Sequence, residues 1–412
     1  MLFEKLEKIG GNRVVLALSA ARLGDAVGNS ILFIVLPLFV GKLPAPAFSM
    51  PETVRVGFLV SLFGLTNAVL QPFAGALIDR VGSRKPFIMA GLSILGLATL
   101  GFIFASRFLD LLLLRLVQGV GVAMTIPAAL ALMVGSRKKE TRGGSMGIYT
   151  TSRMLGLGIG PLVGGALYDK YGFDAAFYAG SGFIILALIL VQLWVKEEPV
   201  KKVEKTPAKI RIIDKSLLTP GILGVAFATL VMAASFSMMA ALEDQFNERL
   251  NMSAFVFGIA FSALLLSRVF TQVPLGRLSD RYGRKPFIIG GLILLAPVTA
   301  MLGFAHSATE LIILRLIQGL ASGGVAAPAF AIAADMAKEG GEGRQMSIVT
   351  MGFGLGVALG PLLAGVLAVY SFTLPFIIGG LICLPGAWIV SRLVPETVNL
   401  ERREEKVPST SD

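Results

Sequence analysis

Twelve long apolar runs dominate this sequence and decide what it can fold into. They cover residues 14–40, 54–78, 87–105, 109–134, 146–168 and 174–195, and then 220–242, 254–279, 287–306, 310–335, 346–369 and 371–394. Each is close to the roughly 20 residues that an α-helix needs to cross a bilayer. The composition agrees, because the 412 residues are 55% hydrophobic and only 15% charged. The sequence therefore predicts an all-α integral membrane protein with twelve transmembrane helices.

The distribution of basic residues predicts how these helices are oriented. With both termini placed in the cytoplasm, most of the 37 Lys and Arg fall in cytoplasmic segments and few in external ones. Membrane proteins show this positive-inside bias. We therefore expect a multi-pass protein of the cell membrane, inner or plasma, with both termini cytoplasmic. The net charge of +11 is then explained by insertion and by membrane lipids, so no nucleic-acid partner is expected.

Polar stretches predict the domain organisation. The opening MLFEKLEKIGGNR has mixed charge and no small-residue cleavage site, so we expect a cytoplasmic start and not a cleaved signal peptide. A charged, proline-bearing stretch near the middle of the chain is typical of a linker. We expect a six-helix bundle over residues 1–195, a cytoplasmic linker over 196–219, a second six-helix bundle over 220–394 and a cytoplasmic tail over 395–412.

The sequence argues against an enzyme. A single cysteine, Cys383, excludes a disulfide within the chain, and the single histidine, His306, lies near a predicted helix end. No paired carboxylates, Ser-His-Asp set, phosphate loop or metal-spaced histidines occur in the chain. We expect no catalytic residue, no metal and no cofactor.

The two halves of the chain are copies of one another. GALIDRVGSRKPFIMAG, which starts at Gly75, matches GRLSDRYGRKPFIIGG, which starts at Gly276. LLLLRLVQGVG, with Arg115, matches LIILRLIQGLA, with Arg315, and LGIGPLVGGAL matches VALGPLLAGVL at the same spacing. Three matches in register indicate an internal repeat. Tandem six-helix repeats are the architecture of many carriers, whose substrate site lies between the halves near mid-membrane.

These motifs resemble those of the major facilitator superfamily over the whole length of the chain. Gly75 to Pro86 is similar to the family's signature between helices 2 and 3, and RLVQG, with Arg115, to its helix 4 motif. GLGIGPLVGG, Gly156 to Gly165, resembles the helix 5 "antiporter" motif of the twelve-helix drug:proton antiporters. LGDAVGNSILFIVLP, with Asp25, is similar to the helix 1 segment of tetracycline-type exporters. The resemblance implies a proton-coupled exporter of small amphipathic drug-like compounds that works by alternating access, and we expect a monomer.

The resemblance also implies a gating motif at the cytoplasmic ends of the helices. Glycines let the short loop turn tightly, while the acidic residue would engage another helix's N-terminus and a basic partner when the inner gate is shut. A solvated charge cluster that only fixes topology is the alternative. The expected gating residues are Gly75, Asp79, Arg80, Gly82 and Arg84, with Asp280, Arg281, Gly283 and Arg284 in the second copy and Asp335 as an extra partner.

Helix 5 contains closely spaced glycines around a proline. Small residues let a neighbouring helix approach closely, and a proline can bend the span. The resemblance favours a sliding or gating seam for antiport, whereas simple tight packing explains the glycines almost as well. The residues of this antiporter motif are Gly156, Gly160, Pro161, Gly164 and Gly165.

Asp25 is the only carboxylate predicted deep inside a span. It lies twelve residues beyond Arg13, which places it about 18 Å into the membrane. Ionised groups at this depth are costly and usually functional. Arg22, Asp25 and Asn29 recur at helical spacing, so we expect one polar stripe that faces a cavity. Burial raises and a nearby Arg lowers the pKa of a carboxyl group, so we expect proton coupling at Asp25 with Arg115 nearby. A static Arg22–Asp25 pair is the alternative.

Other polar, basic and adaptable residues of the spans are expected to line the substrate cavity. Because five arginines lie well inside spans, away from the span ends, the interior leans positive, which favours substrates with an anionic or polar group. Export or flipping of an endogenous lipid, sugar or anionic metabolite is therefore the alternative function, and a channel or a transport-inactive sensor also stays open. Substrate and proton are expected to compete for the Asp25 region. The cavity residues are Arg22, Asn29, Asn67, Gln71, Arg153, Phe236, Met239, Arg268 and Arg315.

Overall fold

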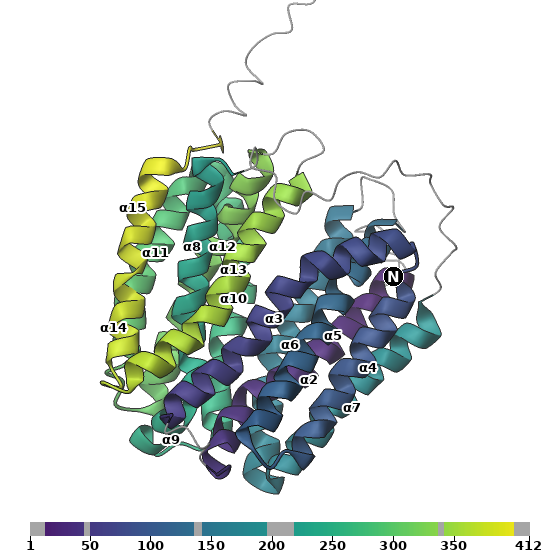
Figure 1. Cartoon of the computed structure of the whole chain (residues 1–412). Coiled ribbons are helices and arrows are strands. Elements are labelled where there is room, and N and C mark those ends of the chain that lie inside the picture. Colours follow the sequence, from purple (N-terminus) through teal and green to yellow (C-terminus); the bar gives the residue numbers. More distant parts are fainter. Residues whose placement is uncertain (1–12, 45–49, 136–141, 196–217, 337–341, 399–412) are drawn as a thin grey trace, which may run out of the picture. The chain divides into compact units, whose positions relative to one another are not determined.

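A computed structural model describes residues 13–44, 50–135, 142–195, 218–336 and 342–398. Its helices in the first half of the chain are α2 (Arg13–Lys42), α3 (Glu52–Val81), α4 (Lys85–Gly101), α5 (Phe108–Gly135), α6 (Arg142–Tyr171) and α7 (Phe173–Trp194). In the second half they are α8 (Pro220–Ser237), α9 (Glu243–Leu250), α10 (Ala254–Tyr282), α11 (Arg284–Leu302), α12 (Ala308–Asp335), α13 (Glu342–Ala368), α14 (Leu374–Leu381) and α15 (Cys383–Leu393) (Figure 1). The all-helical prediction is confirmed for the described residues.

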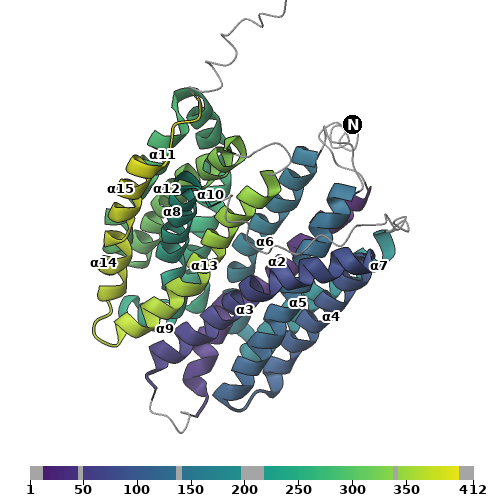
Figure 2. The same ribbon diagram turned by 45° about the horizontal axis from the view of Figure 1, so that its top comes forward.

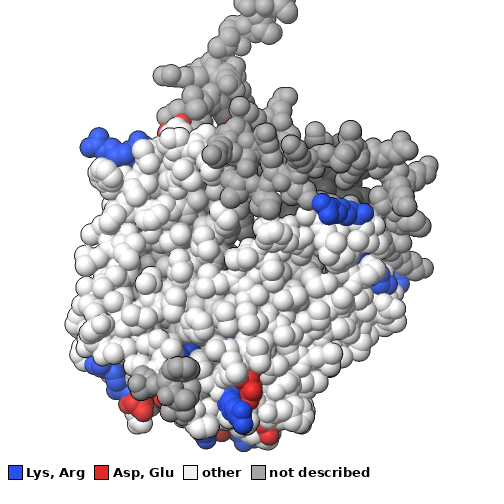
Figure 3. Space-filling model, in the orientation of Figure 1, with Lys and Arg blue, Asp and Glu red and all other residues white. Residues whose placement is uncertain are grey.

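Eleven helical segments in the described residues are long and apolar enough to cross a membrane. They match eleven of the twelve predicted spans, with α14 and α15 together forming one of them, Leu374–Leu393. The twelfth predicted span is α6, which is 30 residues long but carries many glycines and polar residues that lower its hydropathy. On the face that Figure 3 shows, charged residues lie near helix ends and the surface between them is uncharged. Large apolar side chains such as Leu97 and Phe270, 69% and 72% exposed, suit contact with lipid.

The helices cluster into two compact units. One unit contains Met1–Ile212 and Ala240–Leu265, and the other contains Ile213–Met239 and Leu266–Asp412. Contacts therefore place α9 and the first part of α10 with the first unit, although they belong to the second half of the sequence. The expected division into bundles over residues 1–195 and 220–394, which follows the sequence repeat, stays a prediction.

The first unit is held together by α2, which packs against both α6 and α7, while α4 packs against α5 and α7 (Figures 1 and 2). Glycines of α6 make close contacts with α2. A Cβ at Gly156 would lie 2.6 Å from the carbonyl oxygen of Leu23, and a Cβ at Gly160 would lie 2.6 Å from that of Val27. The Ser30 hydroxyl donates to the Gly156 carbonyl at 3.2 Å. The helix 5 glycines therefore let the backbones of α2 and α6 approach closely, a packing that membrane helices favour.

The second unit repeats this construction. Its helix α8 packs against α13, and α11 packs against α12. The Ser237 hydroxyl donates to the Gly356 carbonyl at 3.3 Å, as Ser30 does to Gly156 in the first unit. A Cβ at Gly360 would lie 2.5 Å from the carbonyl oxygen of Ala234. The internal repeat read from the sequence is thus present as repeated helix packing.

Candidate functional site

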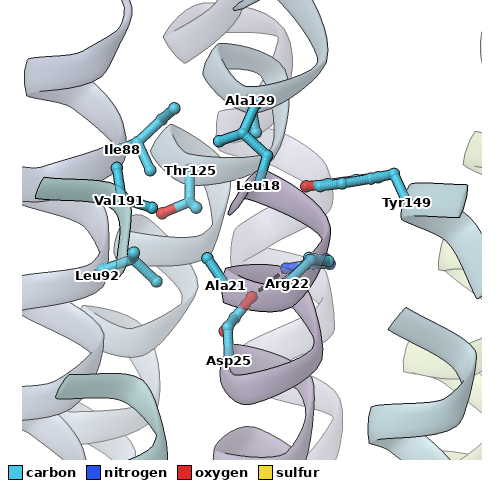
Figure 4. A pocket seen from close by; sticks show the side chains of 10 residues that line it. All are labelled: Leu18, Ala21, Arg22, Asp25, Ile88, Leu92, Thr125, Ala129, Tyr149 and Val191. Atoms are coloured by element: carbon cyan, nitrogen blue, oxygen red, sulfur yellow. Dashed lines mark hydrogen bonds and ion pairs between the residues drawn. The ribbon is translucent and has the colours of Figure 1, made fainter. Parts of the chain in front are cut away.

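The site centres on an ion pair inside the first unit. Asp25 and Arg22 are three residues apart on α2 and therefore lie on one face of the helix. Their side chains are almost fully buried, at 4% and 7% exposure, and the Arg22 Nη1 donates to the Asp25 Oδ2 (Figure 4). The predicted pairing of these two residues is therefore present in the structure.

A small cavity of about 10 Å³ lies beside this pair, and ten side chains from α2, α4, α5, α6 and α7 surround it. A volume of this size is enough for about one water molecule. The Tyr149 side chain of α6 extends toward α2, with its ring 5.9 Å from the Arg22 guanidinium (Figure 4). Thr125 supplies a hydroxyl from α5, and the remaining lining is mostly apolar. These surroundings leave the ion pair little contact with solvent.

The cavity is too small for a substrate. Ligand pockets for drug-sized molecules measure roughly 300–1,000 Å³, far more than the space beside Asp25. The competition between substrate and proton that the sequence led us to expect in the Asp25 region stays a prediction. A role for Asp25 that acts through the helices that surround it fits the small cavity beside it.

Arg153 and Asn29 complete the polar surroundings. Arg153 of α6 interacts electrostatically with Arg22, Tyr149 and Asp25, so two guanidinium groups share one carboxylate. Asn29, one turn beyond Asp25, is 9% exposed, and its Oδ1 has no hydrogen-bond partner among the described residues. The polar stripe expected on this helix is present, but Asp25 faces a cavity within the first unit.

Arg115 belongs to a neighbouring group and does not share the Asp25 carboxylate. It is fully buried, its Nη1 donates to the Gln118 Oε1 at 3.2 Å, and its guanidinium lies 5.3 Å from the Phe63 ring centre. Gln118 in turn donates to the Thr99 hydroxyl at 2.9 Å. Arg115 does not line the cavity beside Asp25. A part of Arg115 in proton coupling stays a prediction. Because Arg115 contacts Gln118 and does not contact Asp25, such a part is indirect.

The second unit contains the repeat of that group. Arg315 is fully buried and donates through Nη1 to the Gln318 Oε1 at 2.7 Å and to the Phe236 carbonyl at 3.0 Å. Gln318 donates to the Thr299 hydroxyl at 3.0 Å. The Arg-Gln-Thr arrangement therefore occurs once in each unit, on equivalent helices.

The other expected cavity residues fall into two kinds. Arg268 is 3% exposed and lies 5.0 Å from the Phe353 ring centre, and Phe353 lies 6.0 Å from the Phe236 ring. Phe353 was not anticipated, because an isolated aromatic residue in an apolar span carries no distinguishing signal. Met239 is fully buried, and Asn67 and Gln71 of α3 are half-buried.

The gating motif has different geometry in the two copies. Gly82 ends α3 in the left-handed conformation with φ 76°, which glycine adopts without strain, and Gly283 has φ 107°. The side chain of Asp79 lies outside the described residues, Arg80 is exposed and Arg84 is half-buried. In the second copy Arg281 is exposed, whereas Arg284 carries the contacts.

Arg284 connects three parts of the second unit. It donates to the Asp280 Oδ1 at 3.1 Å and pairs with Asp335 at the end of α12. The Glu396 carboxylate, just beyond α15, accepts from the backbone N–H groups of Arg284 and Lys285 at 2.9 and 3.0 Å. The expected partner Asp335 is therefore in place, while Glu396 was missed, because only tertiary folding brings it to the N-terminus of α11.

The antiporter motif faces two neighbours. Gly156, Gly160 and Gly164 face α2, whereas a Cβ at Gly165 would lie 2.5 Å from the Ala254 carbonyl at the start of α10. The Asp169 carboxylate accepts from the backbone N–H groups of Ala254 and Phe255 at 3.2 and 2.9 Å. These contacts explain why the first part of α10 clusters with the first unit.

Paired bundles of membrane-length helices, a repeated packing scheme and a carboxylate buried at mid-helix together define a polytopic transporter fold. Comparison with known families agrees: the sequence model described as Major Facilitator Superfamily matches residues 18–247 and 223–411. The chain belongs to this superfamily. It is therefore a transporter and not an enzyme.

Curated relatives cover most of the chain at modest identity. The uncharacterised MFS-type transporter YuxJ of Bacillus subtilis is 28% identical over 82% of this chain and 88% of its own length. The multi-drug resistance efflux pump PmrA homolog of Lactococcus lactis is 27% identical over 84% and 86%. The multidrug resistance protein MdtG of Enterobacter lignolyticus is 28% identical over 87% and 86%.

Solved structures show the same fold. A crystal structure of a bacterial homolog of the human lysosomal transporter Spinster, in an inward-facing and occupied conformation, matches with a TM-score of 0.77. The alignment covers 92% of this chain and 96% of that one at 15% identity. Its inward-facing and unoccupied structure gives a TM-score of 0.72 at 17% identity. At identities as low as these, the matches show the fold alone.

Proposed function

We propose that the chain exports small amphipathic drug-like compounds across the cell membrane in exchange for protons, by alternating access. The observation that carries this proposal is the buried Arg22–Asp25 pair, in a family whose relatives at 27–28% identity include multidrug efflux pumps. Both termini are assigned to the cytoplasm, in keeping with the distribution of Lys and Arg. A monomer suffices, since each chain carries both repeats.

Protonation of Asp25 changes what holds α2 in place. An ionised Asp25 neutralises Arg22 and attracts Arg153, both of which are near it. A neutral Asp25 leaves two neighbouring guanidinium groups without a counter-charge in a space with room for about one water. Repulsion between Arg22 on α2 and Arg153 on α6 then favours a different packing of these two helices. The glycine contacts between α2 and α6 provide the surface along which such a change occurs.

Coupling is therefore indirect in this proposal. The substrate binds elsewhere, and the protonation state of Asp25 biases which arrangement of α2 and α6 is stable. A proton can only shift that equilibrium by its difference in affinity for the two arrangements. Arg115 and its Gln118 partner are joined by a buried hydrogen bond on α5, and we expect them to help position this helix.

The test is transport of a fluorescent cation such as ethidium in proteoliposomes, with and without an imposed pH gradient. Asp25→Asn is expected to lose most gradient-driven transport while still exchanging labelled for unlabelled substrate, because binding and rocking do not need the proton. Asp174→Asn, at an exposed position of α7, is the matched control. Gradient-driven transport by Asp25→Asn at the wild-type rate would refute proton coupling through this residue.

A second substrate class is favoured by the arginines of the second unit. Arg268 lies over the Phe353 ring, and Phe353 lies beside Phe236. A cation next to aromatic rings suits an amphipathic molecule with an anionic headgroup, such as a lipid or an anionic metabolite. A binding screen with paired anionic and cationic amphiphiles distinguishes the two, since preference for the anionic series supports this second function.

A further inference from the structure

A fully buried glutamate at the start of α9 has no part in the mechanism proposed above. Glu243 is 0% exposed and is the first residue of α9, a short helix that packs against α2 within the first unit. Neither carboxylate oxygen has a hydrogen-bond partner of normal geometry among the described residues. Asn247, one turn further along α9, is close enough to stabilise the charge only slightly.

The charged groups that act on Glu243 are acidic. Asp244 follows it on α9, and Asp169 lies at the end of α6, where it is exposed and accepts from the first N–H groups of α10. The Tyr168 hydroxyl of α6 is also within electrostatic range of Glu243 and Asp244. Burial first, and then the charges of Asp244 and Asp169, raise the pKa of the Glu243 carboxyl well above its usual range.

Among the described residues, the side chains that act on the Glu243 charge include no basic one. Arg55 of α3, which is 7% exposed, acts on Glu52, whose neighbours also include Asp244 and Glu248. The Lys42 ammonium at the end of α2 lies 5.4 Å from the Phe173 ring centre. Among the residues that the structure describes, no group of three acidic, histidine or cysteine side chains is arranged to hold a metal ion. A proton is the cation that a buried carboxyl group without a counter-charge takes up most readily.

An ionised carboxylate at this place would be costly. Burying a charge without a counter-charge or good hydrogen bonds is strongly unfavourable, and in practice such a group becomes neutral. A protonated Glu243 removes both the desolvation cost and the repulsion from Asp244 and Asp169. The packed arrangement of α9 thus requires a bound proton.

We propose that Glu243 is a second proton-binding residue, separate from Asp25, and that its proton holds α9 and the first turn of α10 packed against α2 and α6. When Glu243 is ionised, it moves toward water and away from Asp244. The segment from α9 to the first turn of α10 then leaves α6. The two hydrogen bonds from Ala254 and Phe255 to Asp169 are lost with it.

The sign of the pH dependence follows from this. A carboxyl group whose pKa is raised in the packed arrangement stabilises that arrangement at low pH, and the stabilisation is lost as the pH rises through its pKa. In the topology proposed above, α9 lies at the external end, so external acid closes this end. This order of events, protonation from outside followed by closure of the external end, suits a protein that takes up protons from outside. Only this last point depends on the proposed function.

The test measures access to Ala254, which is 3% exposed in the packed arrangement. Cys383→Ser removes the native thiol, and Ala254→Cys is then labelled by a hydrophilic maleimide from mildly acidic to mildly basic pH. Glu248→Cys, at an exposed position of the same helix α9, corrects for the pH dependence of thiol reactivity. We expect the corrected labelling of Ala254→Cys to rise with pH, by up to about tenfold for each pH unit, between the ordinary pKa that Glu243 has in the open arrangement and its raised pKa in the packed one, and to level off above that range.

Variants at Glu243 test whether its carboxyl group causes the pH dependence of labelling. Glu243→Gln is permanently neutral and should keep labelling low at every pH, whereas Glu243→Asp keeps a carboxyl group and should retain the rise. Glu248→Gln should behave as wild type. A corrected rate that does not change with pH in the wild type, or a rise that persists in Glu243→Gln, would overturn the proposal.

The measurement needs no substrate and no gradient, so it is independent of drug transport. In an Asp25→Asn background the rise should persist, which separates the two proton sites. If Asp25→Asn does not impair transport, the labelling result for Glu243 still stands. If labelling does not depend on Glu243, the transport result for Asp25 still stands.

Discussion

Replacing Asp25 by alanine should destabilise the protein far more than an ordinary surface substitution. The change leaves the Arg22 guanidinium, 7% exposed, without its counter-charge and beside a second guanidinium, that of Arg153. The adjoining cavity of about 10 Å³ admits about one water, and the space that the carboxylate vacates adds little more, so solvent replaces only part of what the carboxylate contributes. Breaking a buried ion pair by removing one partner costs about 3–5 kcal/mol, against about 0–1 kcal/mol for an exposed pair.

The assay is equilibrium unfolding in mixed micelles by a denaturing detergent. Asp25→Ala is compared with Asp174→Ala, whose exposed carboxylate in the first turn of α7 should contribute at most about 1 kcal/mol. The double variant Arg22→Met with Asp25→Leu removes both charges and should recover most of the loss, because apolar side chains of similar volume often replace a buried pair at little cost. A loss below about 1 kcal/mol for Asp25→Ala, or no recovery in the double variant, would refute the view that this pair is desolvated.

Three further predictions test packing, capping and substrate contacts. Gly160→Ala places a Cβ 2.6 Å from a carbonyl oxygen of α2 and should cost about 1–3 kcal/mol in the same assay, whereas Gly182→Ala, with no atom within 4 Å, should be nearly neutral. Glu396→Gln removes a charge from two hydrogen bonds at the start of α11 and should lower stability by about 1 kcal/mol, while Glu248→Gln should have little effect, as thermal melts will show. Phe353→Leu removes the ring beside an arginine and should weaken binding of anionic amphiphiles about two- to fivefold in a titration, with cationic ones less affected.

Most of the fold was predictable because membrane-spanning helices appear in the sequence as long apolar runs. Each predicted span has a helical counterpart, and the repeated motifs correspond to repeated packing. The exception is instructive: α6 has the glycines that let it approach α2, and the same glycines make it the least apolar of the spans. The short helix α9 was not predicted, because its polar sequence lies between the apolar runs from which the spans were predicted.

The site was only partly predictable. The Arg22–Asp25 pair followed from spacing along one helix, which sequence reveals directly. Contacts between helices did not: the ring of Tyr149 beside Arg22, the Asp169 carboxylate at the start of α10, and the Glu396 carboxylate at the start of α11 all join residues far apart in the chain. Sequence also could not reveal how small the space beside Asp25 is, since that depends on side chains from five helices.

The two proposed proton sites are connected by the same pair of helices. Asp25 lies midway along α2, and α2 packs against α9, which begins with Glu243. The helix α6 carries Arg153 near Asp25, the glycines that face α2, and Asp169 at its far end. A change in how α2 packs on α6 therefore reaches both carboxyl groups without a further intermediary. Each site then biases the same contact between α2 and α6. Protonation of Asp25 should therefore change the proton affinity of Glu243, and protonation of Glu243 should change that of Asp25 by the same factor.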